Sequence, residues 1–163
     1  VFINQVTQEI SNALESVVQF RLYNPLRLNH TALKGICIDE ESPEEKKIVM
    51  DQNETVDHET LYTHLFRSNC PVTNQPDWAS IIITYAGPKM NRGAVLSYLL
   101  NYREKQAFHE QCISEIYSDL LQQCHCLELI VYGAFTRRGG IAIHPIRATN
   151  EIRLAQPYHF LKT

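Results

Sequence analysis

The order of hydrophobic patterns in the second half of the chain constrains its fold more than any other feature. Three runs rich in branched apolar residues predict strands, at 79–85, 127–135 and 141–146. Two stretches with apolar residues three or four positions apart predict helices, at 92–105 and 107–124. The order strand, helix, helix, strand predicts an antiparallel sheet with a helix pair packed on one face, which is an α+β fold.

The first part of the chain carries weaker patterns. Residues 4–16 predict an amphipathic helix, and two β-rich runs, at 17–23 and 32–38, predict short strands. Half of the chain's 18 acidic residues fall between positions 39 and 59. This composition favours a solvated connecting loop over an acidic metal site. Residues 61–66 then predict a short amphipathic helix.

Composition limits the class of protein. Of the 163 residues, 44% are apolar and 20% charged, which is enough apolar material for the core of one domain or of a large piece of a two-domain protein. A formal net charge of −3 argues against a nucleic-acid-binding surface, and no apolar run is long enough to cross a membrane. Five cysteines without zinc-finger spacing predict reduced thiols in a cytoplasmic protein and no structural zinc.

Cys70 is the first candidate for chemistry, because it lies in a polar turn between Asn69 and Pro71. Cys112 and Cys124, by contrast, lie inside apolar periodic runs, where a cysteine is typically structural. A thiol in a polar turn stays accessible, but it is a reactive nucleophile only where its pKa is lowered.

Asp77 follows in the same turn, between Pro76 and Trp78. A carboxyl group against an indole is partly desolvated, which raises its pKa and suits it to donate a proton near neutral pH. The alternative is a turn residue that accepts backbone hydrogen bonds. A thiol and a carboxyl group on one proline-bounded turn are more specific together than either is alone.

Phe108, His109 and Glu110 form a second cluster, at the start of the second predicted helix. An aromatic side chain can stack on a purine-like base, and a carboxylate can accept hydrogens from its ring N–H and exocyclic amine. A carboxylate is also favourable at any helix N-terminus, which would explain Glu110 without a ligand.

The string Arg137-Arg138-Gly139-Gly140 is a third candidate. Paired glycines permit positive φ and a close backbone approach, and adjacent arginines offer forked donors to phosphate. A β-hairpin turn with solvated arginines explains the string equally well. It is neither a Rossmann nor a P-loop fingerprint, so any dinucleotide would bind without those scaffolds.

These clusters, in this order and spacing, resemble the QueF family of NADPH-dependent 7-cyano-7-deazaguanine reductases. The matching strings are Ser68-Asn69-Cys70, Gln75-Pro76-Asp77-Trp78, Phe108-His109-Glu110-Gln111-Cys112 and Thr136-Arg137-Arg138-Gly139-Gly140, followed by Pro145 and Arg147. The resemblance is continuous from about Glu59 to Arg147, and it is closest to the carboxy-terminal half of the longer, two-half members.

The resemblance implies a tunnelling fold (T-fold), in which antiparallel sheets and helix pairs assemble into a barrel. Residues 59–163 would be the catalytic T-fold unit, and residues 1–58 the end of the first half with its acidic connecting segment. Because sites in this fold are shared between halves or subunits, a homo-oligomer, either a dimer or a larger assembly, is expected.

The resemblance also implies roles for the three clusters. Cys70 would attack the nitrile carbon to give a covalent thioimide, and Asp77 would donate a proton. The residues implied to bind are Phe108, His109 and Glu110 for the deazaguanine, and Arg138 and Gly139 for NADPH. Two hydride transfers would give 7-aminomethyl-7-deazaguanine, a precursor of the tRNA nucleoside queuosine.

Two departures from the family pattern qualify these expectations. Ala142 and His144 stand where the family usually has an acidic residue and an asparagine. A Glu-Ser-Lys string that helps to bind base and cofactor is absent, and in two-half members it lies upstream, so residues 1–163 alone are expected to be inactive or badly impaired. The alternatives are NADPH-independent amino-group transfer to the same nitrile, a non-catalytic base-binding fragment, and a zinc-dependent cyclohydrolase, for which a Cys/His set is missing.

Overall fold

The computed structural model describes residues 2–20, 33–43 and 50–150, and of residues 50–53 the backbone alone. The chain divides into two compact units, residues 1–30 and 31–163. In the first unit, α1 (Phe2–Leu14) confirms the predicted helix and buries none of its residues. Residues 17–20 lie in no strand, and the rest of the strand predicted at 17–23 lies outside the described residues.

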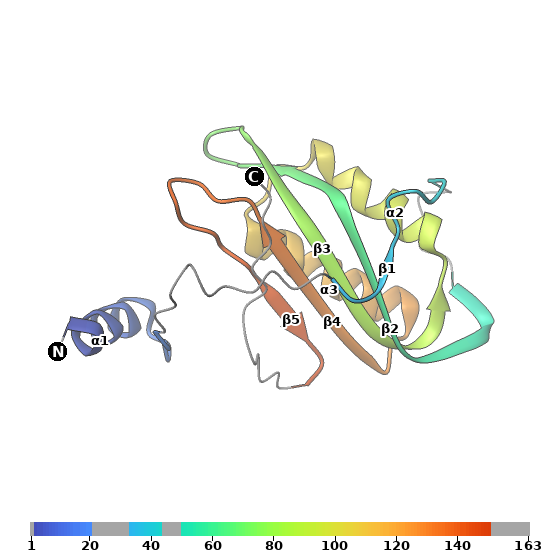
Figure 1. Ribbon diagram of the computed structural model, residues 1–163, viewed down its shortest axis with the longest axis horizontal. Coiled ribbons are helices and arrows are strands. Elements are labelled where there is room, and N and C mark those ends of the chain that lie inside the picture. The colour runs from blue at the N-terminus through green and yellow to red at the C-terminus, as the bar shows by residue number, and fades with distance from the viewer. Residues whose placement is uncertain (1, 21–32, 44–49, 151–163) are drawn as a thin grey trace. The chain divides into compact units, whose positions relative to one another are not determined.

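A five-stranded mixed sheet forms the second unit (Figure 1). In chain order and in spatial order its strands are β1 (Ile36–Cys37), β2 (Met50–Asn69), β3 (Pro76–Met90), β4 (Glu128–Phe135) and β5 (Ile146–Ala148). β1 runs parallel to β2, and the other neighbours are antiparallel. β2 includes residues 58 and 59, and the register of its pairing with β3 shifts between Val56 and Glu59.

The helices of this unit lie on one face of the sheet (Figure 1). They are α2 (Arg92–Leu100), its 3₁₀ continuation η2 (Asn101–Glu104) and α3 (His109–Cys124). This arrangement confirms the predicted α+β class. No helix in the described ranges combines the length and the apolar character that crossing a membrane requires.

The core lies between the helix pair and the sheet. Its fully buried side chains include Leu61, Ile81, Ile83 and Val131 from the strands, and Leu96, Leu99, Ile113 and Ile116 from the helices. A smaller apolar cluster on the other sheet face is centred on Ile82, Tyr132 and Ala134. Cys112 and Cys124 are both fully buried in the main core, as their apolar surroundings predict.

β2 contradicts two of the predictions. It includes residues 50–59 of the loop predicted at 39–59, and all of the helix predicted at 61–66. Residues 54–58 of this strand are mostly exposed, and the backbone from Met50 to Val56 pairs with β3 from Gly87 to Met90, so hydrogen bonding and not burial sets the structure here. Farther along β2, the register of its pairing with β3 shifts between Thr63 and Phe66. Such a bulge changes the phase of the period-two pattern, which gives the apolar residues helix-like spacing.

Two other predicted strands differ from those observed. The strand predicted at 32–38 is reduced to Ile36–Cys37 within the described residues. The last strand is Ile146–Ala148 and not 141–146, because Ile141 closes a tight turn with Arg138 through two backbone hydrogen bonds of 3.0 Å. The apolar residues Ile141 and Ile143 are therefore exposed.

Candidate functional site

Cys70 occupies the first position after β2, in the turn that leads into β3. Its N–H donates to the carbonyl oxygen of Gln75 at 2.8 Å, and its own carbonyl oxygen accepts from the N–H of Asn74 at 2.8 Å. Asn74 has φ +54°, a left-handed conformation that asparagine tolerates well. The turn is therefore closed by its own backbone, and it holds Cys70 half-buried.

The pKa of the Cys70 thiol is lowered from its ordinary value. The main cause is a hydrogen bond from the Thr73 side chain, followed by the backbone N–H groups of Thr73 and Val72. Partial desolvation and the negative charge of Asp77 oppose this shift. A lowered pKa increases the thiolate fraction, which is the condition that the sequence left open for a reactive cysteine.

The start of α3 lies beside this turn because the preceding connector pairs with the end of β2. The N–H of Asn69 donates to the carbonyl of Lys105 at 2.9 Å, and the N–H of Ala107 donates to the carbonyl of Asn69 at 3.1 Å. The side-chain amide of Gln106 also donates to Asn74 Oδ1 at 2.9 Å. Two candidate clusters far apart in sequence are thus joined by backbone pairing.

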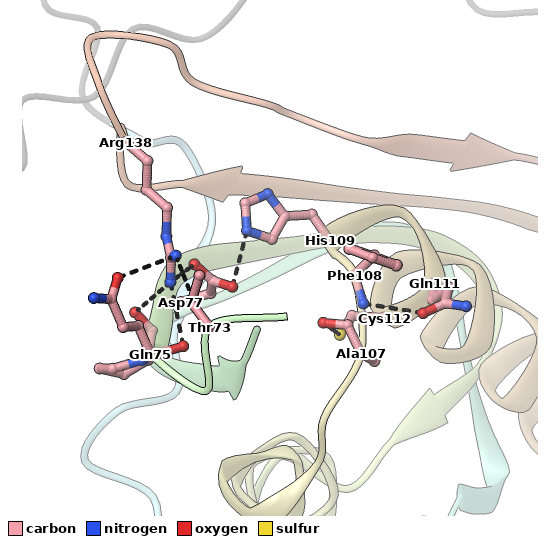
Figure 2. Close-up of polar contacts among 10 residues, drawn as sticks. Thr73, Gln75, Asp77, Ala107, Phe108, His109, Gln111, Cys112 and Arg138 are labelled. Atoms are coloured by element: carbon pink, nitrogen blue, oxygen red, sulfur yellow. Dashed lines mark hydrogen bonds and ion pairs between the residues drawn. The ribbon is translucent and has the colours of Figure 1, made fainter. Parts of the chain in front are cut away.

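Asp77 is buried, with only 4% of its surface exposed. Its Oδ1 lies 2.6 Å from Nη2 of Arg138, and its Oδ2 lies 3.3 Å from Nε2 of His109 (Figure 2). Trp78 is the next residue of β3 and is 42% exposed on the opposite face. The carboxyl group is therefore buried, but not by the Trp78 indole as the sequence predicts. Arg138 and His109 lie against it instead.

His109 has its ring fixed by an aromatic contact. It stacks on Phe135 with ring centroids 3.9 Å apart and an interplanar angle of 10°. Phe135 ends β4 and is itself buried. Nδ1 of His109 is buried and has no hydrogen-bond partner among the described residues. An unsatisfied buried nitrogen costs about 1–3 kcal/mol, so this atom suits a ligand that can bond to it.

Phe108 and Glu110 flank His109 at the same helix terminus, and both are exposed. Phe108 is 48% exposed, and its N–H donates to Oε1 of Gln111 at 3.0 Å, which caps the helix. Glu110 is exposed in the first turn of α3. Its carboxylate has no partner within the described residues, so both side chains are available to a ligand.

The hairpin tip that carries Arg138 and Gly139 leans over the Cys70 turn (Figure 2). Gly139 and Gly140 have φ values of +56° and +83°, and a Cβ added to either would meet nothing within 4 Å. They form the two central residues of a tight turn whose positive φ values favour glycine. The tip is thus open, whereas the guanidinium of Arg138 is occupied by Asp77 and the turn.

The structure brings together Cys70, Asp77, His109 and Arg138, and it adds residues that the sequence did not single out. These are Thr73 and Gln75 in the turn and Phe135 at the end of β4. Thr73 lies three residues after the candidate nucleophile, which is where the first turn of a capping motif places its donors. Phe135 carries no sequence signal, because only the pairing of β3 with β4 sets it beside His109.

Similarity to known proteins extends over most of the chain. A family model described as QueF-like protein matches residues 76–153. A protein of Acinetobacter baylyi named NADPH-dependent 7-cyano-7-deazaguanine reductase is 39% identical over 94% of this chain and 62% of its own length. The protein of the same name from Buchnera aphidicola subsp. Schizaphis graminum is 38% identical over 90% of this chain and 60% of its own length.

A solved structure supports the fold independently. The apo form of an archaeosine synthase QueF-Like matches with a TM-score of 0.56 at 13% identity, over 61% of this chain and 100% of that chain. This likeness confirms the expected T-fold and extends no further than the fold. The chain spans about three fifths of the length of the curated relatives it matches. Residues 76–153 are therefore similar to a QueF-like domain, and most of the chain is similar to the curated proteins named NADPH-dependent 7-cyano-7-deazaguanine reductase.

Proposed function

We propose that this chain carries the nucleophile and the proton donor of an NADPH-dependent nitrile reductase in queuosine biosynthesis. Its substrate would be 7-cyano-7-deazaguanine and its product the 7-aminomethyl compound. The observation that carries the proposal is a Cys70 thiol of lowered pKa on the same turn as a buried Asp77. The names of the relatives supply the substrate and the cofactor.

The first chemical step belongs to Cys70. Its thiolate would add to the nitrile carbon, and the nitrile nitrogen would take up a proton as the carbon–sulfur bond forms. Asp77 Oδ2 and His109 Nε2 lie 3.3 Å apart, so one proton can be held between them and delivered to that nitrogen. The product would be a covalent thioimide, which accepts hydride far more readily than a nitrile does.

Substrate binding would fall to the start of α3. The deazaguanine base carries a ring N–H and an exocyclic amine, which fit the exposed carboxylate of Glu110 in the first turn of α3. Phe108 offers an exposed ring for stacking. The buried, unsatisfied Nδ1 of His109 offers a further hydrogen-bonding atom beside the proton donor.

Two NADPH molecules bound in succession would supply one hydride each to take the nitrile to the amine, and the carbon–sulfur bond would break between the two transfers to give back the Cys70 thiolate. The residues that fit the phosphates of NADPH are at the hairpin tip, where Gly139 and Gly140 leave open space and Arg137 is exposed. Arg138 is the other expected contact, and its terminal nitrogens already bind the Cys70 turn. A phosphate contact through those nitrogens would require Arg138 to change partners.

The test is covalent adduct formation without cofactor. The chain is incubated with 7-cyano-7-deazaguanine and its intact mass is recorded, with Cys70→Ala as the negative variant and Cys37→Ala as a matched control at an exposed cysteine. We expect a gain of one ligand mass in the parent and in Cys37→Ala, and none in Cys70→Ala.

Further additions to the same sample distinguish the possible reactions. NADPH should discharge the adduct if the chain is a reductase. Discharge by ammonia and not by NADPH would favour amino-group transfer, and base binding without any adduct would favour a non-catalytic fragment. An adduct that persists in Cys70→Ala would overturn the assignment of the nucleophile.

A further inference from the structure

Arg138 makes more polar contacts than any other side chain of the candidate site. Its Nη1 donates to Thr73 Oγ1 at 3.1 Å and to Gln75 Oε1 at 3.3 Å. Its Nη2 donates to the carbonyl oxygens of Gln75 at 3.2 Å and Pro76 at 3.4 Å, and lies 2.6 Å from Asp77 Oδ1 (Figure 2). The guanidinium thus spans the turn from Thr73 to Asp77, the segment that follows the nucleophile.

The contact with Thr73 fixes the direction of a hydroxyl proton. A guanidinium has donors only, so Thr73 Oγ1 must accept in its bond with Arg138. The single hydroxyl hydrogen of Thr73 is then free to point elsewhere. Cys70 lies on the same backbone-closed turn as Thr73. The Thr73 side chain is also the first cause of the lowered pKa of the Cys70 thiol, so this hydrogen is available to the thiolate.

We propose that Arg138 is a positioning residue for the nucleophile: its fork holds the turn and orients the Thr73 hydroxyl toward Cys70 before any cofactor binds. This role rests on the proposed function for its meaning and goes beyond the cofactor contact that the family resemblance implies. All four Nη hydrogens have acceptors within the turn. A lysine keeps the charge but has no planar fork, so it cannot bridge Thr73, Gln75 and Asp77 at once.

The test measures Cys70 reactivity without nitrile or NADPH, so it is separate from the test of the proposed function. The rate of iodoacetamide alkylation of Cys70 is followed against pH in a Cys37→Ala background, which removes the exposed competing thiol. Thr73→Val, Arg138→Lys and their double variant are compared with the background. Thr73→Ser keeps the hydroxyl, and Arg147→Ala removes an exposed arginine of β5 whose Nη1 donates to the Ile146 carbonyl oxygen.

We expect Thr73→Val and Arg138→Lys each to move the alkylation midpoint to higher pH and to slow alkylation below the midpoint by about tenfold, the size of one hydrogen bond to a charged group. Thr73→Ser and Arg147→Ala should match the background. The double variant should be no slower than Thr73→Val, because Arg138 acts through that hydroxyl.

Two outcomes would overturn the proposal. One is an unchanged pH profile of alkylation for Arg138→Lys, which would show that the positive charge of Arg138 is sufficient and its forked geometry is not needed. The other is additivity of the two changes, which would make their effects independent. Thr73 is exposed in a surface turn. Thr73→Val therefore tests whether the Thr73 hydroxyl acts on Cys70, even if an Arg138 variant folds poorly. An unchanged profile for Thr73→Val would also contradict it.

Discussion

Asp77 acts in opposite directions on the reactive groups around it. Its carboxylate oxygens face Arg138 and His109, and its negative charge raises the pKa of Cys70 against the hydrogen bonds that lower it. The same group would supply the proton that the nitrile nitrogen needs. It therefore raises the pKa of the resting thiol, and in the proposed mechanism it supplies a proton as the carbon–sulfur bond forms.

Replacing Asp77 by asparagine should separate these two effects. Asp77→Asn keeps an oxygen that can accept from Arg138 but removes the negative charge. The pKa of Cys70 should fall, so alkylation at a pH below the midpoint should become about threefold faster. Reduction of the nitrile should fall by about 100-fold or more, because a general acid is lost. Parallel alkylation and NADPH-oxidation assays measure the two effects.

Asp77→Asn should thus speed the alkylation of Cys70 and slow the reduction of the nitrile. If Asp77→Asn slows alkylation as well as turnover, the carboxylate supports the nucleophile and does not restrain it. If turnover is unchanged, Asp77 is not the proton donor. Turnover is measured in a version of the chain that is active before the substitution, so that a loss can be seen.

At the level of elements, the helices and the central strands could be predicted from apolar spacing alone. The predictions failed where hydrogen bonding to a neighbour decides the structure. β2 is the clear case: its outer half is polar and exposed, and β3 alone specifies it as a strand. A period-two pattern interrupted by the bulge between Thr63 and Phe66 then imitates a helix.

The candidate residues could be named from the sequence, but the contacts between them could not be predicted. Cys70 and Asp77 share a turn, so their proximity follows from sequence. The placement of His109 depends on connector pairing at Asn69, and the engagement of Arg138 depends on a hairpin folding back over the turn. Such contacts join segments more than 30 residues apart, which local patterns do not encode.

Gly133 of β4 provides a test of how the sheet supports the site. A Cβ at this position would lie 2.7 Å from Ile113 Cδ1 and 2.9 Å from the ring of Phe135. Gly133→Ala should therefore destabilise the chain by about 1–3 kcal/mol, as overpacking of a core does. Because Phe135 stacks on His109, nitrile reduction should fall as well. Denaturant unfolding and turnover measure the two losses.

A second change can show that steric crowding is the cause. Ile113→Val removes the methyl group nearest to the new Cβ and alone should cost about 0.5–1.5 kcal/mol. In the double variant it should recover part of the stability that Gly133→Ala loses, a coupling measured by a double-mutant cycle. Simple additivity would mean that backbone effects, and not this contact, explain the loss.

For the whole folded unit, buried tyrosines set a limit on stability at high pH. The Tyr85 hydroxyl donates to Glu59 Oε2 at 2.6 Å, and the Tyr98 hydroxyl donates to Asp119 Oδ2 at 2.6 Å and lies 3.0 Å from the Tyr102 hydroxyl. Desolvation raises the pKa of all three phenols, and the neighbouring carboxylates raise it further. The fold therefore binds these three protons more tightly than the unfolded chain does.

Stability should consequently fall as pH rises above about 10, the pKa of tyrosine in an unfolded chain. Above that pH the unfolded state binds fewer protons, and each of the three tyrosines lowers the free energy of unfolding by about 1.4 kcal/mol per pH unit. Since domains are stable by about 5–15 kcal/mol, the unit should unfold cooperatively between about pH 11 and 13. Tyrosinate absorbance and circular dichroism should change together, and Tyr98→Phe should make the decline with pH shallower by about a third. Full ionisation near pH 10 with unchanged dichroism would show that these hydroxyls are not held by the fold.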